Sequence, residues 1–533
     1  MDGNSVQILV AMVIYMAIVI AIGVVYAKRA NKSSEEYFLG GRSLGPWVTA
    51  MSAEASDMSG WLLMGLPGVA YWCGLADAFW TAFGLAIGTY LNWLIVSKRL
   101  RRYSVRANNA ITLPEFFSNR FREKKKTLMF LAAAFILIFF TVYAASCFVT
   151  CGKLFSTLFG MPYVSMMILG AVFVLLYTLL GGFLAESASD FMQAIVMIVA
   201  LTVIVVLGTA QAGGINAVLE NARQIPGFLE FFGLATPVVD ANGQQLVEAG
   251  QPLFGEAADY GLLSVCSMLA WGLGYFGMPH ILLRFMAIED ENKLKTSRRV
   301  ASVWVVISMG VAVLIGVVGY SLMQMGILPT YTDASAAETI IVDIAKFLST
   351  YGFVPAITGG IILAGILAST MSTADSQLLA AASSVSQNLI VEAFRVKVST
   401  KTNMIIARVS VIVISIVAIF LAADPSSSVF RIVSFAWAGF GAAFGPVILC
   451  ALFWKRANKY GAISGMIAGG VTVFIWKFVV RKLCAGTILD IYELLPAFIV
   501  GLIVIVVVSL LTPAPSLEIT NTYEEVKENC KGF

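Results

Sequence analysis

The stretch SAEASDMSGWLLMGLPG, residues 52–68, decides how this chain of 533 residues folds. It lies in an apolar segment long enough to cross a bilayer, yet it carries a carboxylate, Asp57, among small and hydroxyl-bearing residues. Such a charge costs at least a few kcal/mol unless water or a cation compensates it. Small residues let the helix open, and the freed carbonyl oxygens are typical ligands of a hard cation such as sodium. The alternative is a hydrated kink used for packing. Glu54, one turn earlier, either belongs to the same site or faces a water-filled vestibule.

A second interrupted segment is WGLGYFGMPH, residues 271–280, with three glycines and a proline in ten positions. Pro279 removes one intrahelical donor, which frees the carbonyl of Tyr275 four residues earlier. Trp271 and Tyr275 are four residues apart, so they face the same side of the opened segment. Ordinary aromatic packing at a proline kink is the alternative. His280 is interpreted as a structural or interfacial histidine rather than a proton carrier.

A third polar segment, ASTMSTADS at residues 368–376, offers hydroxyl groups inside an apolar stretch. Ser369 and Ser372 are three residues apart, with Thr373 beside them, so together they can supply oxygens to one cation. Hydroxyls that bond back to their own helix are the alternative. Asp190 is a further carboxylate inside an apolar segment, where solvation at a helix end competes with a role in the cation path.

The whole chain is strongly apolar, with 59% hydrophobic and 12% charged residues. That charged share is about half the usual value and cannot coat a soluble protein of this length. Because the apolar stretches recur along the entire chain, the sequence predicts an all-α polytopic membrane protein. Seven scattered cysteines without a C-x-x-C pair and a single histidine favour neither a metal centre nor a His-dependent enzyme. Without a long basic tract, nucleic acid is not expected as a partner.

Apolar windows of about 20 residues predict thirteen transmembrane helices. They cover residues 6–27, 45–70, 75–97, 127–157, 162–181, 186–211, 259–283, 300–326, 352–390, 403–423, 428–454, 460–480 and 493–511.

The distribution of lysine and arginine predicts the orientation of these helices, because basic residues are retained on the cytoplasmic side. With the N-terminus outside, about 28 of the 35 basic residues lie in cytoplasmic connections. Thirteen spans then leave the C-terminal tail in the cytoplasm. The two interrupted segments are five spans apart, and matching broken helices in two halves indicate an inverted-repeat transporter with its site between them.

Several long motifs resemble the sodium/solute symporter family, over about residues 7–511. The motifs are LGGRSLGP (39–46), ASDMSGWLLMGLPG (55–68), WGLGYFG (271–277), PHIL (279–282), AWAGFGAAFGP (436–446) and ALFWKRANKYGAISG (451–465). The resemblance is strongest to the proline-transporting branch of the family. Three residues depart from that branch: Glu54 replaces a small residue, Met278 a glutamine and Ser369 an alanine.

The resemblance implies one LeuT-like transporter domain at residues 1–511, in which two inverted five-helix repeats lie at about 45–211 and 259–454. One extra helix precedes the repeats, two follow, and a short cytoplasmic tail occupies 512–533. The implied sodium ligands are the carbonyls of Ala55 and Met58, the position of Ser369, and the hydroxyls of Ser372 and Thr373. The expected substrate contacts are Ser59, Gly60, Trp61, Tyr143, Trp271, Tyr275 and Pro279. The functional charged residues expected in addition are Arg42, Glu54, Asp57 and Asp190.

The function expected from the resemblance is import of L-proline together with sodium, by alternating access and without enzymatic chemistry. The expected location is the cytoplasmic membrane of a bacterium. Symport of another small amino acid or a carboxylate, coupled to sodium or protons, is the first alternative. A membrane sensor input domain is the second, although some 22 residues after Leu511 are too few for a kinase module.

Overall fold

A computed structural model of the protein describes residues 3–30 and 32–529. The last four residues of the predicted tail, 530–533, therefore lie outside the described residues. The first part of the chain forms α1 (Gly3–Ala30), α2 (Ser34–Leu39), η1 (Gly40–Arg42), α3 (Pro46–Asp57), η2 (Trp61–Gly65), α4 (Leu66–Cys73), α5 (Leu75–Leu91), η3 (Asn92–Val96), α6 (Ser97–Arg106), α7 (Leu113–Arg120), α8 (Thr127–Phe159) and α9 (Tyr163–Gln211), where η denotes 3-10 or π segments.

The middle of the chain contains the only strands among the described residues, followed by the second broken helix. Its elements are α10 (Ile215–Arg223), β1 (Gly233–Leu234), β2 (Val247–Glu248), β3 (Gln251–Pro252), β4 (Ala258–Asp259), α11 (Leu262–Leu269), α12 (Trp271–Gly274), η4 (Tyr275–Gly277), α13 (Pro279–Ala287), η5 (Glu291–Lys293) and α14 (Leu294–Gln324). β1 pairs with β4 and β2 with β3, both antiparallel.

The last part is again helical. It comprises η6 (Ala336–Thr339), α15 (Ile340–Ser349), α16 (Phe353–Ser383), η7 (Ser384–Ala393), α17 (Thr400–Leu421), α18 (Val429–Phe453), α19 (Lys459–Ile475), η8 (Trp476–Val480), α20 (Arg481–Leu483), α21 (Leu494–Leu511) and α22 (Leu517–Asn529).

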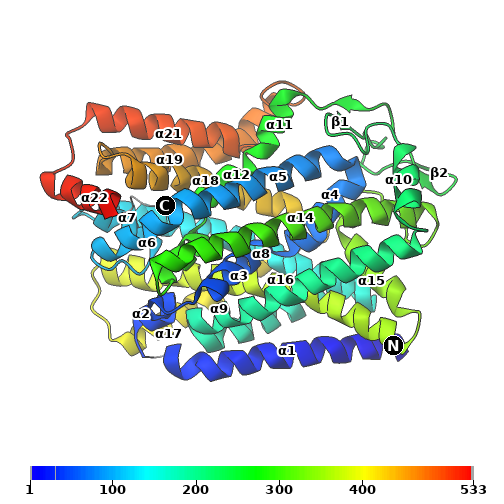
Figure 1. The fold of residues 1–533 in the computed structure, drawn as a ribbon, viewed down its shortest axis with the longest axis horizontal. Helices are drawn as coiled ribbons and strands as arrows, with labels where there is room; N and C mark the ends of the chain where they lie inside the picture. Colours follow the sequence, from blue (N-terminus) through cyan, green and yellow to red (C-terminus); the bar gives the residue numbers. More distant parts are fainter. Residues whose placement is uncertain (1–2, 31, 530–533) are drawn as a thin grey trace.

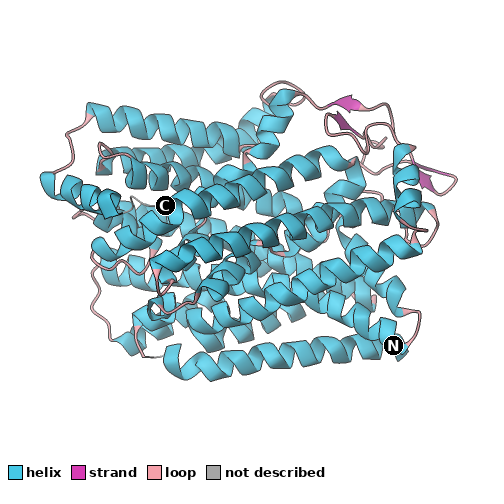
Figure 2. Cartoon of the chain, viewed as in Figure 1, coloured by secondary structure: helices cyan, strands magenta, loops and turns pink. Residues whose placement is uncertain are grey.

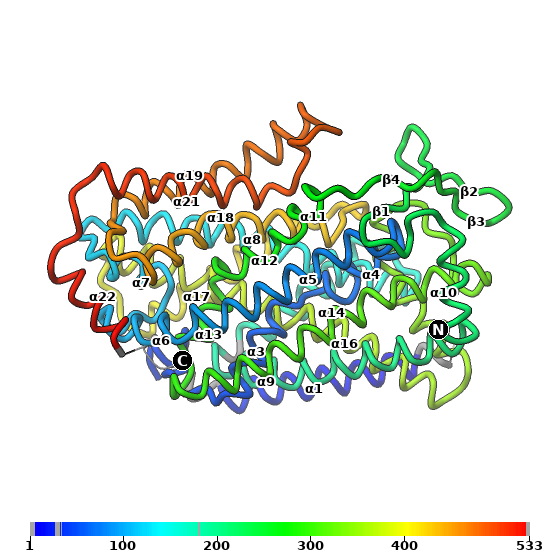
Figure 3. The backbone as a smooth tube through the Cα atoms, turned by 45° about the horizontal axis from the view of Figure 1, so that its top comes forward, coloured from blue at the N-terminus to red at the C-terminus, as the bar shows by residue number. Residues whose placement is uncertain are grey.

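The helices lie side by side as one bundle, with α1 along one edge and α19 and α21 along the opposite edge (Figure 1). The short strands are confined to one end (Figure 2). We call this the strand end, and the opposite end, which carries α22, the tail end (Figure 3).

The thirteen predicted spans are all helical. Within residues 3–30 and 32–529, ten helices are long and apolar enough to cross a membrane, and the pair Leu262–Gly277 and Pro279–Ala287, bent by 46°, counts as an eleventh span if taken together. Two shorter apolar helices, Trp61–Cys73 and Tyr163–Leu179, occupy the remaining predicted spans. The fifth and sixth spans run on as α9, which is interrupted only at Gly182, where φ is 66° and ψ is −176°. Glycine permits this positive φ, so the two spans are joined there without a longer loop.

The buried core is built from the helices that carry the polar segments. α3, α16 and α18 are buried along most of their length, whereas α1 and α17 expose many large apolar side chains. Exposed apolar side chains on the outer helices suit a lipid environment, in which only the backbone and interior polar groups need protein partners. The interrupted helices are therefore placed at the centre of the bundle.

Candidate functional site

The first broken helix opens at the predicted position. α3 ends at Asp57 because Met58 leaves the helical conformation, with φ −81° and ψ 71°. The amide of Ser59 donates to the carbonyl of Asp57 at 3.0 Å, where a continuous helix would direct it to Ala55. The hydroxyl of Ser372 in α16 donates to the Ala55 carbonyl at 2.8 Å. A side chain from a distant helix thus takes up the freed carbonyl.

The opened segment packs closely against α8. A Cβ atom on Gly60 would lie 2.2 Å from Oγ1 of Thr150, so only glycine allows this approach. The hydroxyl of Tyr143 donates to the carbonyl of Asp57 at 3.2 Å, and the indole of Trp61 donates to the same carbonyl at 3.3 Å. These two predicted substrate contacts therefore hold the break in its present shape.

The second broken helix also follows the sequence prediction. η4 ends at Gly277, Met278 is extended with φ −76° and ψ 109°, and Pro279 begins α13. The side-chain amide of Asn92 donates to the carbonyl of Tyr275 at 3.0 Å. Because Pro279 has no N–H, this carbonyl needs such an external donor when it is buried.

A direct hydrogen bond joins the two broken helices. The hydroxyl of Tyr275 donates to Oδ2 of Asp57 at 2.5 Å. Oδ1 of Asp57 is buried and has no hydrogen-bond partner among the described residues. A carboxylate oxygen removed from water without a donor is costly, and a bound cation would compensate it.

Oxygens from α3 and α16 also meet where α3 ends. The hydroxyl of Ser372 reaches the carbonyl of Ala55 and also that of Ser369, the latter at 3.2 Å. The hydroxyl of Ser369 bonds back to Ile366 of its own helix at 2.8 Å, so only its carbonyl joins the group. The Thr373 hydroxyl is buried and has no partner among the described residues. None of the hydrogen bonds of the described residues joins the carbonyl of Met58 to this group.

Aromatic rings cover the break on the side of the strand end. The rings of Trp61 and Trp271 are 5.7 Å apart between centroids, and the Ser59 hydroxyl accepts from the Trp61 amide at 3.4 Å. Trp271 and Tyr275 both contact Trp437, with ring centroids 6.2 and 5.1 Å from that of Trp437. The predicted placement of Trp271 and Tyr275 on one side is thereby confirmed. Trp437 itself lies in one of the motifs that carry the family resemblance.

A cavity of about 900 Å³ opens at the strand end and reaches this aromatic cover. Its inner part is lined by Trp271, Phe430 and Tyr492. The ring centroids of Phe430 and Tyr492 lie 5.3 and 5.2 Å from that of Trp271. Trp61 is fully buried below them. Trp271 therefore lies between the cavity and Trp61 of the first broken helix in this conformation. Phe430 and Tyr492 were not predicted as site residues, because nothing in their local sequence distinguishes them from packing aromatics.

Arg42 lies away from the break, at the tail end. Its NH1 donates to the carbonyl of Met286 at 2.6 Å, its NH2 to the carbonyl of Ala110 at 2.8 Å and its Nε to Asn109 at 3.1 Å. Burial, together with the nearby Arg101, lowers the pKa of Arg42 to about 10. The side chain therefore ties the end of α13 to the segment between α6 and α7.

Two carboxylates have surroundings that the sequence did not predict. Glu54 is 1% exposed and accepts a hydrogen bond from the indole of Trp93 at 3.0 Å, so the vestibule alternative is wrong for this conformation. Asp190 is fully buried and accepts from Ser52 at 2.7 Å and from Arg284 at 3.1 Å. Solvation at a helix end is therefore also wrong for Asp190, because an ion pair replaces water.

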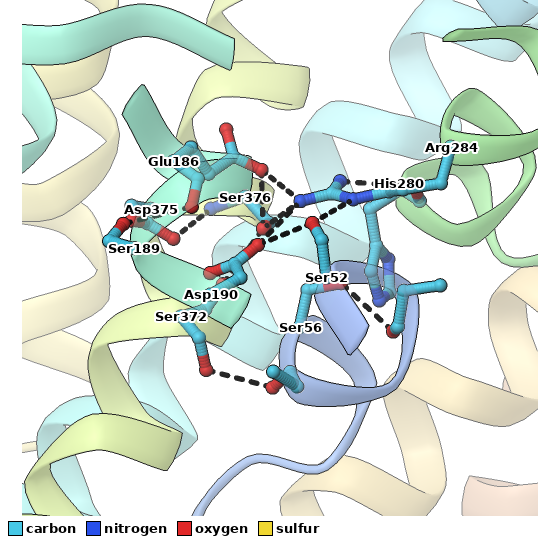
Figure 4. A network of polar contacts seen from close by, with 12 residues as sticks. Ser52, Ser56, Glu186, Ser189, Asp190, His280, Arg284, Ser372, Asp375 and Ser376 are labelled. Carbon is cyan, nitrogen blue, oxygen red and sulfur yellow. Dashed lines mark hydrogen bonds and ion pairs between the residues drawn. The ribbon is translucent and has the colours of Figure 1, made fainter. Parts of the chain in front are cut away.

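Arg284 is the charged residue that the sequence prediction missed. It is 1% exposed and pairs with Glu186 as well as with Asp190, both from α9 (Figure 4). Arg284 and Glu186 each fall at the boundary of a predicted span, where charges are expected to meet water. Only the packing of α13 against α3, together with the ion pairs from Arg284 to α9, makes these charges internal.

Comparison with known proteins decides the family. The family model described as the sodium:solute symporter family matches residues 37–469. The sodium/proline symporter of Haemophilus influenzae is 42% identical over 529 residues, covering 98% of both chains. The chain belongs to the sodium:solute symporter family. The sodium/proline symporter of Escherichia coli is 40% identical over 523 residues, with 98% of this chain and 96% of the relative covered. The osmoregulated proline transporter OpuE of Bacillus subtilis is 40% identical over 513 residues, 96% of each chain.

Solved structures agree on the fold of this symporter family member. A sodium-coupled sialic acid symporter in an outward-open state matches with a TM-score of 0.74 at 18% identity, covering 96% of this chain and 99% of the other. MhsT in complex with L-phenylalanine matches with a TM-score of 0.53 at 13% identity, covering 88% and 98%. The predicted LeuT-like fold is thereby confirmed.

Proposed function

We propose that this protein imports L-proline together with sodium across the cytoplasmic membrane of a bacterium by alternating access, with the N-terminus outside and the C-terminus in the cytoplasm. The names of the relatives at about 40% identity support the substrate and the ion. The observation that carries the proposal is the bond from Ser372 to the freed Ala55 carbonyl. It joins a hydroxyl of α16 to a carbonyl of α3 two residues before Asp57, at which α3 ends and whose buried Oδ1 has no partner among the described residues.

Sodium would bind where α3 breaks beside α16. The proposed ligands are the carbonyls of Ala55, Met58 and Ser369 and the hydroxyls of Ser372 and Thr373. For sodium to enter, the hydroxyl of Ser372 must turn its hydrogen away from Ala55 and offer a lone pair, because a cation needs acceptors only. The carboxylate of Asp57 would offset the charge of the desolvated ion. Glu54 and Asp190 are assigned to the charge balance around the broken helices.

Proline would bind on the side of the break that faces the strand end. Trp61, Trp271 and Tyr275 would enclose the apolar ring, while the opened backbone at Ser59 and Gly60 would offer donors to the carboxylate. Tyr143 and Pro279 complete the proposed contacts. Binding from outside would require Trp271 to separate from Phe430 and Tyr492, and release inside would require the tail end, including the contacts of Arg42, to open.

The driving force is sufficient with one sodium ion per proline. One charge that moves inward across roughly 100 mV gains about 2.3 kcal/mol. A tenfold sodium gradient adds about 1.4 kcal/mol. The sum supports an accumulation of roughly 500-fold.

Uptake of labelled L-proline into proteoliposomes tests the proposal. We expect uptake with an inward sodium gradient and only the rate of empty liposomes when choline replaces sodium. Excess unlabelled L-proline should compete, whereas other small amino acids and carboxylates at the same concentration should compete weakly. Equal or stronger competition by another solute would assign the site to that solute instead.

A further inference from the structure

Arg284 in α13 contacts three other elements of the bundle at once, α9, α3 and α16. Besides its ion pairs with the two α9 carboxylates, its Nε donates to the hydroxyl of Ser52 in α3 at 3.0 Å and its NH2 to the hydroxyl of Ser376 in α16 at 2.8 Å. NH1 donates to the carbonyl of His280 at 3.1 Å. Each nitrogen of the guanidinium therefore has a partner, and the planar group is fixed in one orientation (Figure 4).

The two serines lead directly to the proposed sodium ligands. The hydroxyl of Ser376 also donates to the carbonyl of Ser372 at 2.8 Å, and the hydroxyl of Ser372 bonds to Ala55. Ser52 lies three residues before Ala55 in α3 and is therefore one turn away from it. Arg284 thus closes a ring of contacts around the place where α3 and α16 meet.

Carboxylates hold the guanidinium in this ring. Glu186 and Asp190 lie one turn apart on α9 and both pair with Arg284. Oε1 of Glu186 also lies 2.5 Å from the Ser376 hydroxyl, so it and the Ser372 carbonyl are the two acceptors available to the single hydrogen of that hydroxyl. The carboxylate of Asp375 accepts the amide of Ser376 at 2.7 Å. A buried guanidinium with this many charged partners has few alternative positions.

We propose that Arg284 is a positioning residue for sodium, which sets the distance between Ala55 on α3 and Ser372 on α16. This inference rests on the proposed function, because it concerns the same cation site. Arg284 does not contact the ion. It acts through Ser52 on one side and through Ser376 on the other, so the oxygens of the two helices face each other before sodium arrives.

The test compares three variants of the full-length protein. Ser376→Ala removes the link to Ser372 and leaves the ion pairs of Arg284 in place. Arg284→Lys keeps the charge but loses the planar fork that reaches both serines. Ser383→Ala is the matched control, because the Ser383 hydroxyl lies on the same helix and, in the part of the chain that the structure describes, donates only to the carbonyl of Ala380 in that helix.

Equilibrium binding of radiolabelled sodium to the purified protein is measured without proline, together with thermal stability. We expect Ser376→Ala to weaken sodium binding by about 3- to 10-fold, as for the loss of one hydrogen bond, and Arg284→Lys to weaken it further. Ser383→Ala should bind sodium as the wild type does. The rate of proline uptake at saturating sodium should remain that of the wild type in Ser376→Ala.

Wild-type sodium affinity in folded Ser376→Ala would overturn the positioning role, and so would an equal loss in Ser383→Ala. Should Arg284→Lys not accumulate in the membrane, Ser376→Ala decides alone. A wild type that binds sodium but transports no proline would contradict the proposed function and leave the positioning role standing. A wild type without sodium binding would contradict both.

Discussion

Asp57 is the residue on which the account depends most. Its buried carboxylate is held by Tyr275 on one oxygen, and the other oxygen has no donor among the described residues. We expect Asp57→Asn to nearly abolish sodium-driven uptake, because the charge that offsets a desolvated cation is lost. The measurement is the initial rate of proline uptake at several sodium concentrations. Asp77→Asn is the control, since Asp77 is likewise bonded to a tyrosine hydroxyl, that of Tyr260, at 2.5 Å. Wild-type sodium dependence in Asp57→Asn would contradict the assignment.

Tyr275 has two separable roles, one in its ring and one in its hydroxyl. Tyr275→Ala should weaken proline binding by about 1 to 3 kcal/mol, or roughly 5- to 150-fold, because a buried apolar contact is lost. Tyr275→Phe keeps the ring and removes only the bond to Asp57, so proline binding at saturating sodium should change little. Binding of labelled proline to both purified variants checks this. Equal proline affinity in folded Tyr275→Ala would remove the ring from the pocket.

For individual residues, the sequence predicts which polar groups lack a partner in their own helix, but it does not predict which distant residue supplies that partner. The carbonyl of Tyr275 was predicted to be free because Pro279 lacks a donor, and this follows from the chain alone. Asn92 supplies the missing donor. This contact depends on the packing of α5 and η3 against the second broken helix, and no local sequence pattern predicts that packing. The same holds for the bond between Asp57 and Tyr275, whose residues are 218 positions apart.

The broken segment after α3 depends on its close approach to α8. Gly60→Ala places a Cβ atom against Thr150, and we expect a loss of about 1 to 3 kcal/mol in stability, as for other overpacked sites. Thr150→Ala shortens the opposing side chain and should restore part of this loss in the double variant. Thermal unfolding of the four proteins in detergent measures the coupling. If the loss of stability in the double variant equals the sum of the losses in the two single variants, Gly60 and Thr150 do not interact.

Helices were predicted well and the ends of helices less well. Among the described residues, ten of the thirteen predicted spans correspond to long apolar helices, one to a bent pair and two to shorter apolar helices, because hydropathy reflects the lipid environment directly. Arg284 and Glu186 were missed for the same reason, since a charge at the end of an apolar window is expected to lie in water. Here α13 and α9 continue past those residues inside the bundle, so both charges are buried and paired.

The orientation of the whole molecule is testable with its own cysteines. Cys484 lies between α20 and α21, and the proposed topology places it outside, on the same side as the strand end. A membrane-impermeant maleimide should label the wild type in right-side-out vesicles more strongly than Cys484→Ser. In inverted vesicles this difference should vanish. A difference between the wild type and Cys484→Ser that is present only in inverted vesicles would contradict the proposed topology.

For the whole molecule, the central claim is that sodium and proline bind together at the two broken helices. Symport at this site requires that sodium favours the binding of proline, and proline must then raise the affinity for sodium by the same factor, because coupling between two sites is reciprocal. The most direct measurement is equilibrium binding of labelled L-proline to the purified protein over a series of sodium concentrations, with choline keeping the ionic strength constant. We expect proline affinity to rise with sodium in the wild type, and Ser372→Ala and Thr373→Ala to shift this rise to higher sodium concentrations. Proline affinity that is independent of sodium would contradict it.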